Sequence, residues 1–529
     1  MFKPGRKEQQ LSIDDRFLDF PKYILEALQK SFAESFYTDI FLKVNEDRFT
    51  VLYSETFSRP NKPVNILVSL LILKELHNLS DEELLSSFYF DYRYQYALGI
   101  ENFEKERICI NTLTNFRQRL VEYEVTTGID LLKAEVDALS AQLANLIELD
   151  KSMARMDSFL LSSSCKKLSR LELVYRVVQQ MIQAAHKVDP TLVPEHLQEY
   201  LKSEHKNKTI YHAKSSEAGD KLATQFENAA ELYQHLFNKD KCREMKEFKV
   251  LTRLLNEQCI ETEEGFLIPL EGKELSPSNL QNPSDPDATY RYKNGNGDVG
   301  YVVNLVEVRD KAKNVGLILS HDVQNNLYSD AEFGENFLDQ DPLATEISVL
   351  SADGAYYRHE SLQKAKEKEI EMNVSTMTGR KPAKDKLAVN QFLIDENQQI
   401  TECPAGHTAE HSKYDVEKKV YTAKFSKAIC ASCPFLDQCP IQQQKKFNTV
   451  RFTENKLQTD IVRSQMNSDR HYLLSNFRAG VEGIVSALRR GFKIDDIPIR
   501  GLVRSKIWIH SKILAYNFRT VTKYRARTA

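Results

Sequence analysis

Residues 349–360, VLSADGAYYRHE, raise the first question about this chain. Small or apolar residues lead into Asp353, and Gly354 follows it directly. A short run that ends in a carboxylate beside a glycine predicts a strand that brings the acid to the edge of a sheet. Asp-Gly is also a common turn dipeptide, and an aspartate after a strand often only caps a helix. A catalytic role for Asp353 therefore depends on other carboxylates in matching settings.

The composition is that of an ordinary globular protein: 529 residues, 41% hydrophobic and 28% charged, with a formal net charge of −3. Such a length predicts roughly two to four domains. No apolar run reaches the length of a membrane span, and residues 1–10 lack the apolar core of a signal peptide. We therefore expect a cytoplasmic protein with no membrane partner. The eight cysteines then argue against a disulfide framework.

Positive charge gathers at the end of the chain. From Gly483 onward there are eleven Lys or Arg residues but only two acids, Asp495 and Asp496. A basic end on a neutral protein is typical of binding to a polyanion, and nucleic acid is the first candidate. A solvated face is the simpler alternative. We expect residues 516–529 to form a basic tail.

Helical patterns dominate residues 1–145, which predict a helical N-terminal domain that binds DNA ends or serves as a scaffold. Within it, Ser80 and Glu83 form a capping box before an apolar helix face. Residues 167–260 are polar and also helical in pattern, which indicates an insertion or an oligomerisation arm.

Strand patterns begin at residues 146–162, which hold Asp150 and Asp157. From residue 288 they continue with a hairpin whose turn is expected at 294–298, followed by further strands and an intervening helix. This order predicts a mixed α/β sheet whose first strand carries Asp157. The catalytic core would then span 146–400 and 441–515, interrupted by a different module at 401–440.

The segment FRAGVEGIVSALRRGF, residues 477–492, predicts a helix with a buried stripe of Val481, Ile484, Val485 and Leu488. Arg478, Glu482 and Arg489 then fall in a narrow sector beside that stripe. One interpretation is a set of salt bridges along the helix. The other is an acid at the edge of the core, with cations ready for phosphate.

Two strand-end aspartates and a helical glutamate suit the cleavage of phosphodiesters. Attack on phosphorus builds negative charge on the attacking and leaving oxygens, and two divalent cations ~4 Å apart stabilise both. Mg²⁺ fits this task, because it takes carboxylate ligands and keeps positions open for water and substrate.

Several motifs in this order resemble the DDE transposases of bacterial insertion sequences, and most nearly the branch with an InsH-like amino-terminal domain. They are RMDSFLLSSSCKKLSRLELV (155–174), DPDATYRYK (285–293) with VGYVVNLVE (299–307), VLSADGAYYRHE (349–360), TGRKP (378–382) and FRAGVEGIVSALRRG (477–491) with IRG (499–501). The resemblance implies an RNase H-like core whose acids match Asp157, Asp353 and Glu482. These would hold Mg²⁺ or Mn²⁺, two ions in the active site.

The resemblance also implies the reaction and the partners. Such enzymes cut DNA at the terminal inverted repeats of their element and rejoin it to target DNA. They hold two ends together, so a homodimer or a larger synaptic assembly is expected, in a bacterial cytoplasm at the nucleoid. Asp150 competes with Asp157 for the first acid. Asp157 is favoured because Ser158 and the LSRLELV stretch follow it, as the family shows.

The third-acid helix of the family often reads Tyr, two residues, Arg, three residues, Glu, six residues, Lys. Here Arg478 and Glu482 match, and Arg489 replaces the lysine. Ser475 stands at the tyrosine position, with Tyr472 one turn earlier. We expect Arg478, Arg489 and the adjacent Arg490 to meet DNA phosphates.

Four of the cysteines cluster within 403–439: Cys403, Cys430, Cys433 and Cys439. A C-x₂-C pair with two further cysteines meets the ligand count of a structural zinc site, and His407 is a possible replacement for one thiolate. Reduced cysteines without a metal are the alternative. The cysteines elsewhere in the chain are interpreted as small core residues.

Three functional hypotheses remain. The first is a transposase that cleaves DNA and transfers strands. The second is a metal-dependent nuclease without strand transfer. The third is a non-catalytic DNA-binding protein derived from a transposase, which the intact set of Asp157, Asp353 and Glu482 disfavours.

Overall fold

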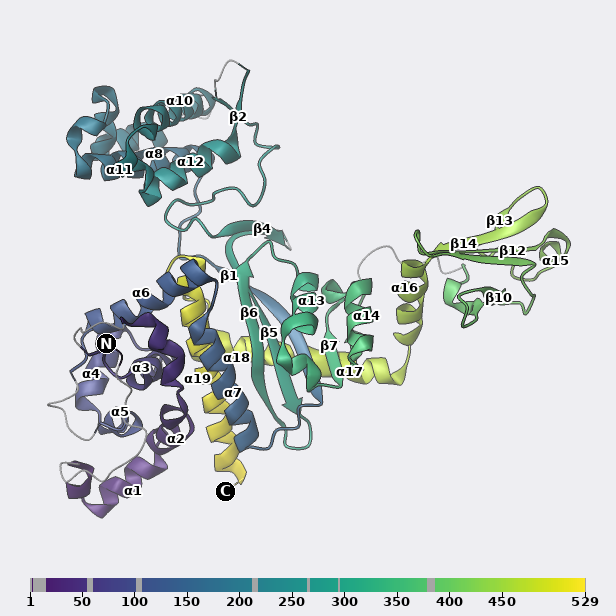
Figure 1. Ribbon diagram of the computed structural model, residues 1–529, viewed down its shortest axis with the longest axis horizontal. Coiled ribbons are helices and arrows are strands. Elements are labelled where there is room, and N and C mark those ends of the chain that lie inside the picture. Colours follow the sequence, from purple (N-terminus) through teal and green to yellow (C-terminus); the bar gives the residue numbers. More distant parts are fainter. Residues whose placement is uncertain are drawn as a thin grey trace.

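The computed structural model describes residue 2 and residues 16–54, 60–100, 107–211, 217–263, 267–293, 295–377 and 386–528. A helical N-terminal region packs beside a central mixed sheet, and two lobes project from that sheet (Figure 1). One lobe is helical and the other is built on small sheets. The expectation of a mixed α/β core behind an N-terminal helical region is thus confirmed. The TGRKP motif lies outside the described residues.

The N-terminal region is a bundle of short helices around one apolar helix. Helix α3 is buried nearly all round, since its sequence VNILVSLLILKELH offers little polar surface. The predicted capping box is confirmed: Ser80 and Glu83 cap the start of α4 reciprocally. The helices are α1 (Lys22–Lys30), α2 (Phe32–Asp39), α3 (Val64–His77), α4 (Asp81–Phe90), α5 (Tyr92–Ala97), α6 (Ile110–Thr127) and α7 (Leu131–Leu146).

The central sheet has the order β4-β5-β1-β7-β8, and β6 also pairs with β5. Strands β1, β7 and β8 run parallel to one another, while the pairs of β5 with β1, β4 and β6 are antiparallel. The strands are β1 (Met153–Ser162), β4 (Thr289–Lys293), β5 (Asn296–Asp310), β6 (Val315–Asn325), β7 (Val349–Ala352) and β8 (Glu371–Val374). Helices α13 (Asp330–Gln340) and α14 (His359–Glu367) connect its later strands.

The predicted hairpin forms between β4 and β5, but its turn is shorter than expected. The ladder already pairs Lys293 with Asn296, and β5 continues through Asp298. Strand pairing therefore includes residues 296–298, which the sequence predicted to lie in the turn. Asn294 lies outside the described residues.

The two lobes have hydrophobic cores of their own. The helical lobe is built on α8 (Arg170–Val188), α10 (Ala218–Phe237) and α12 (Lys246–Gln258), with a small hairpin of β2 (Cys259–Glu261) and β3 (Leu267–Pro269). The other lobe, here the β module, has a core that runs from Val389 to Leu457. It exceeds the predicted 401–440 because flanking residues such as Phe392 close that core.

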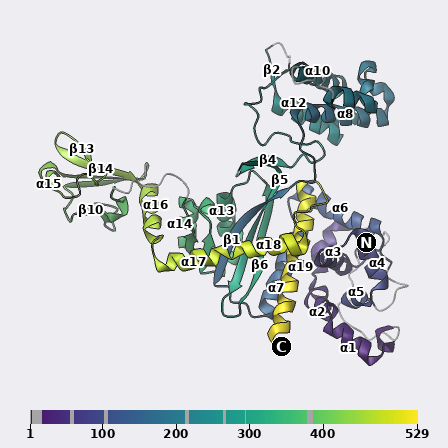
Figure 2. The ribbon, with the colours of Figure 1, turned by 180° about the vertical axis from the view of Figure 1, so that it is seen from behind.

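The C-terminal segment returns from the β module to the core through α16 (Glu454–Gln465), α17 (Asp469–Ala479), α18 (Val481–Phe492) and α19 (Leu502–Thr528). Figure 2 shows α19 between the N-terminal helices and the sheet. The predicted basic tail over 516–529 is wrong, because this segment continues α19 and buries Phe518 and Val521. In the described part of the chain, no helix is both long and apolar enough to cross a bilayer.

Part of the positive charge of the C-terminal end is paired within the molecule. Its cations pair with acids of the N-terminal region: Lys512 with Glu75 (2.6 Å), Lys506 with Glu124 (2.8 Å) and Arg525 with Asp39 (2.8 Å). Arg519 donates to the carbonyl of Leu76. Four of the eleven cations counted from the sequence therefore hold α19 against the N-terminal region.

Candidate active site

Asp157 and Asp353 come from neighbouring parallel strands. Asp157 lies within β1, and Asp353 directly follows β7. The last paired residues of these strands are Arg155 and Ser351, so the same register two residues further on sets Asp157 opposite Asp353. The two carboxylates therefore lie next to each other on neighbouring strands. Asp353 also caps the short turn that follows it, through the backbone N–H of Ala355 (2.6 Å).

Arg478 joins these aspartates to the third acid. At the end of α17 its guanidinium lies 2.8 Å from the Asp157 carboxylate, 3.7 Å from Glu482 and 3.9 Å from Asp353. Only 15% of the Arg478 side chain is exposed, whereas 73% of the Glu482 side chain is. The structure thus brings the three acids that the sequence singled out to one cation. Arg478 is directed into this cluster rather than outward to solvent.

The electrostatics of the cluster favour a cation at its centre. Burial raises the pKa of Asp157, and the neighbouring Asp353 carboxylate raises it further, while Arg478 opposes both. Without Arg478 or another cation, ionised carboxylates would repel one another in a partly desolvated place. Asp150 is not part of this cluster, because it lies before β1 and accepts bonds from Ser152 (2.9 Å).

The three acids are also the donor set that Mg²⁺ or Mn²⁺ prefers. As they stand, no three Asp, Glu, His or Cys side chains in the described ranges are grouped closely enough to hold a metal ion. At the acid cluster the reason is visible, because the Arg478 guanidinium occupies the space between the carboxylates. The residues fit a divalent cation in kind, since all three are carboxylates.

The single helix expected over 477–492 is interrupted at Gly480, which separates α17 from α18. Arg155 explains the interruption. Its Nη1 donates to the carbonyl of Phe477 (2.6 Å), and a Cβ on Gly480 would lie 2.0 Å from the same nitrogen. Arg155 is itself held by a buried ion pair with Glu307. The predicted buried stripe of α18 is confirmed in Val481, Ile484, Val485 and Leu488.

Sequence reasoning missed Arg155, although it stands two residues before the first acid and so shares its face of β1. It also missed the polar support beneath the acids. Ser158 donates to Asp330 (2.5 Å), and the buried Tyr356 hydroxyl donates to Asn304 (2.6 Å). Burial raises the pKa of Tyr356, with nearby carboxylates including Asp157 adding to it.

The other two arginines lie further along α18. Arg489 pairs with Asp495 (3.1 Å), and both side chains are about half exposed to solvent. Arg490 is exposed and has no ion-pair partner among the described residues. Tyr472 is exposed on α17, while the Ser475 hydroxyl lies 3.4 Å from His471.

The four clustered cysteines line one small cavity of about 30 Å³ in the β module, together with His407. All four are free thiols and half-buried. Burial raises the pKa of Cys439, and the other three cysteines raise it further. Cys403 is placed by a tight loop in which its N–H donates to the His407 carbonyl (2.9 Å). The four cysteines therefore line one cavity, although no three of them are grouped closely enough to hold a metal ion as they stand.

Comparison with known families agrees with this geometry. Residues 25–119 match the family described as a transposase domain (DUF772), and residues 402–522 match the transposase DDE domain family. The two matches support a DDE transposase of an insertion sequence. No curated protein and no solved structure gives a match.

The matches bear on the two ends of the transposase. The DDE match includes Glu482 and the clustered cysteines, whereas Asp157 and Asp353 lie before it. With this match, the expected fold class, an RNase H-like core behind an all-α N-terminal domain, is confirmed. The family implies DNA as the substrate and a divalent metal ion as the cofactor.

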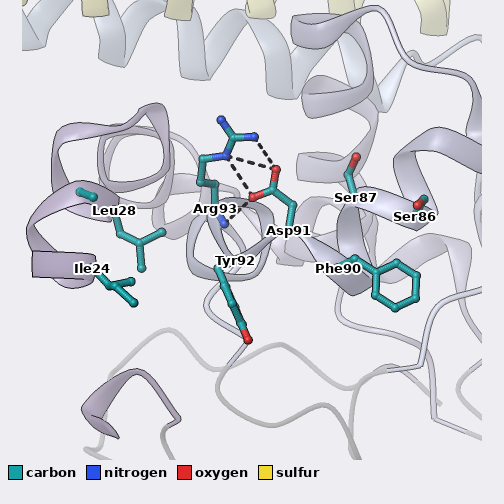
Figure 3. A pocket seen from close by; sticks show the side chains of 9 residues that line it. Ile24, Leu28, Ser86, Ser87, Phe90, Asp91, Tyr92 and Arg93 are labelled. Carbon is teal, nitrogen blue, oxygen red and sulfur yellow. Dashed lines mark hydrogen bonds and ion pairs between the residues drawn. The ribbon is translucent and has the colours of Figure 1, made fainter. Parts of the chain in front are cut away.

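The N-terminal region of the transposase holds an open pocket of about 570 Å³ between α1 and the α4–α5 junction. Figure 3 shows Arg93 turned back onto Asp91, with Phe90 and Tyr92 at the rim. The Arg93–Asp91 pair (2.6 Å) neutralises the cation that lines the pocket. The remaining lining is apolar or hydroxylic, and we assign it no ligand.

Proposed function

We propose that this transposase cleaves DNA at the terminal inverted repeats of its insertion sequence and joins the freed 3′-OH ends to target DNA. Asp157, Asp353 and Glu482 would carry the chemistry. The supporting observation is their convergence on one guanidinium from the middle of β1, the end of β7 and the start of α18. Three acids so far apart in the chain need a shared cation, and phosphoryl transfer uses such a centre.

The three carboxylates would hold Mg²⁺ or Mn²⁺. Two such ions stabilise the attacking and leaving oxygens of a phosphodiester. In the chain itself, Arg478 withdraws from Asp157 and then neutralises a DNA phosphate beside the acids. Arg155 keeps the α17–α18 junction in place, so that Glu482 stays opposite the two aspartates. Arg489 and Arg490 would contact phosphates further along the same DNA strand.

The test is cleavage of DNA that carries the inverted repeats flanking the gene. Asp157→Asn, Asp353→Asn and Glu482→Gln should each lower the Mg²⁺-dependent rate by at least about a hundredfold while DNA binding persists. Asp150→Asn, just before β1 and outside the acid cluster, is the matched control and should cut normally. Near wild-type cleavage by Asp353→Asn would show that the active site is assigned wrongly.

The same reaction separates the competing functions. Joined products beside cleaved ends indicate strand transfer. Cleavage without joining by the wild-type protein would favour a metal-dependent nuclease, and no cleavage at all would favour a DNA-binding protein derived from a transposase. Two ends must be held at once, so we also expect a homodimer or larger assembly on end DNA, in the bacterial cytoplasm at the nucleoid. The N-terminal domain, residues 1–145, would bind those ends.

The cysteine cavity would hold one structural Zn²⁺ through Cys403, Cys430, Cys433 and Cys439. Four thiolates close a tetrahedral shell and leave no position for substrate. Metal analysis of the purified protein should find about one zinc per chain, lost in Cys430→Ser and Cys433→Ser. Cys165→Ser, outside the cavity, should keep it. Equal zinc content in all these variants would refute the site.

A further inference from the structure

The β module presents a sheet face that its core does not use. The sheet has the order β11-β12-β14-β13, with β11 (His411–Asp415), β12 (Val420–Ser426), β13 (Gln442–Gln443) and β14 (Phe447–Thr453). Tyr421, Phe425 and Phe452 pack into the core of the module. Because side chains alternate along a strand, their neighbours Thr422, Lys424 and Arg451 point to the opposite side. We call that side the outer face.

The ladder brings three cations together on the outer face. Lys413 pairs with Thr422, and Thr422 pairs with Arg451. Lys413 and Arg451 therefore lie on either side of Thr422 in one row across the sheet. Lys424 stands two residues further along β12. Strand spacing and rise place the three Cα atoms within ~10 Å of one another. That separation is close to the Debye length at 0.1 M salt, so their positive fields add.

These cations have no acid to neutralise them within the described ranges. Lys413, Lys424 and Arg451 are all exposed, and no described carboxylate lies within ion-pair distance of any of them. Two acids flank these cations along the ladder without an ion pair to them: Glu410 meets Lys424 through its backbone N–H (2.9 Å), and Asp415 accepts the backbone N–H of Lys418 (3.0 Å). In the same strip of chain, Lys445 and Lys446 are exposed just before β14. The charge is therefore available to a partner.

The rest of the outer face is polar, with a single aromatic ring. Lys424 lies over the Phe447 ring at 5.8 Å, and the His411 ring meets the same phenyl edge-on at 6.2 Å. Gln442 and Gln443 are exposed at the edge of the sheet. Such a surface lacks the apolar centre that protein–protein interfaces bury. Cations on a polar surface are sufficient for a phosphate backbone, which needs no apolar contact.

We propose that the outer face is a second DNA-binding surface, which holds the phosphate backbone through Lys413, Lys424 and Arg451. The proposal rests on DNA being the substrate of the chain. The β module projects from the core beyond α16 (Figure 1), so this contact would engage DNA away from the acid cluster. Its contribution is affinity and orientation of the duplex, without a preference for base sequence.

The test compares the full-length protein with a Lys413→Gln, Lys424→Gln, Arg451→Gln triple variant. Affinity for a duplex of about 40 base pairs of random sequence is measured between about 50 and 300 mM salt, where log affinity falls linearly with log salt. Each phosphate contact contributes about 0.9 to the slope. The triple variant should therefore lose nearly three units of slope, and its binding should weaken.

The matched control is a Lys202→Gln, Lys239→Gln, Lys249→Gln variant, which removes the same charge from exposed positions of the helical lobe. It should keep the wild-type slope. An equal loss in the control would overturn the proposal, as would a wild-type slope in the folded triple variant. Weaker self-association with an unchanged slope would also overturn it, in favour of an acidic protein surface as the partner.

The proposed cleavage function is tested independently of the outer face. Asp353→Asn should abolish cleavage while leaving the salt slope at the wild-type value. Loss of slope in the triple variant, together with normal cleavage by Asp353→Asn, would support the outer face and refute the proposed active site. The converse pair of results would refute the outer face alone.

Discussion

At the scale of single residues, Arg478 is the unexpected feature of this chain. The pattern of the third-acid helix suggested a residue that meets DNA, whereas the structure places its guanidinium among three carboxylates. A cation in this place offsets the repulsion between Asp157 and Asp353 before any metal or DNA arrives. The same guanidinium competes with a divalent ion for those carboxylates.

We therefore predict that Arg478→Gln binds Mn²⁺ more tightly than the wild-type protein when DNA is absent. One ion pair with limited solvent exposure, such as Arg478–Asp157, corresponds to about 1 kcal/mol, or roughly a fivefold change in the dissociation constant. Calorimetric titration with Mn²⁺ measures this, and Arg490→Gln is the control with an unpaired arginine. Cleavage by Arg478→Gln should fall even so, because a phosphate contact is lost. Weaker Mn²⁺ binding in this variant would contradict the competition.

At the scale of elements, the junction between α17 and α18 positions the third acid. Arg155 reaches across from β1, caps the carbonyl of Phe477 and fills the space beside Gly480. Glycine is required here by this close approach, since its backbone dihedrals are ordinary helical ones. The helix is therefore interrupted beside a side chain of β1, the strand that carries Asp157, and Glu482 follows this interruption by two residues.

Gly480→Ala should accordingly destabilise the fold by about 1–3 kcal/mol, the usual result of overpacking a buried site. Gly483→Ala is the matched control, because a Cβ at Gly483 meets nothing within 4 Å. In a helix interior that change should stabilise by about 0.5–1 kcal/mol. Denaturant unfolding of both variants measures the difference. Equal stability of the two variants would show that the Arg155 side chain can move away from Gly480 without a loss in the free energy of unfolding.

At the scale of the whole molecule, a buried polar network joins three parts of the fold. His321 of β6 lies 2.6 Å from His510 of α19 and 3.6 Å from Asp137 of α7. His510 in turn lies 2.8 Å from Asp130, which starts α7. Burial lowers the pKa of His321 well below its usual value, and the neighbouring His510 and Lys133 lower it further. His321 is thus neutral in the folded protein around neutral pH.

This shift predicts a loss of stability in mild acid. Below about pH 6.5 the unfolded chain binds a proton at His321 that the folded chain excludes, so stability falls as the pH decreases. One group contributes at most about 1.4 kcal/mol per pH unit. Unfolding midpoints at about pH 7.5 and 5.5 should differ less for His321→Asn than for the wild-type protein. The exposed His235→Asn should keep the wild-type difference, and an unchanged difference in His321→Asn would refute the role of His321.

The sequence by itself determined the local features of this protein. The capping box at Ser80, the buried stripe of α18 and the strand before Asp353 all depend on residues near one another in the chain. Their physical causes, side-chain periodicity and short-range hydrogen bonds, act over a few residues. The resemblance to a known family, carried by short motifs, predicted Asp157, Asp353 and Glu482 as the catalytic acids.

Only the tertiary structure decided how distant residues use their charge. The basic end looked free for DNA, but its partners Glu75, Glu124 and Asp39 lie far away in the sequence and meet it only when α19 docks. The break at Gly480 depends on Arg155 of another element, and the outer face depends on a strand register that unites Lys413, Lys424 and Arg451. Long-range ion pairs and cross-strand neighbours depend on packing. Burial of the hydrophobic core determines which surfaces come into contact, and charged side chains can pair only where those surfaces meet.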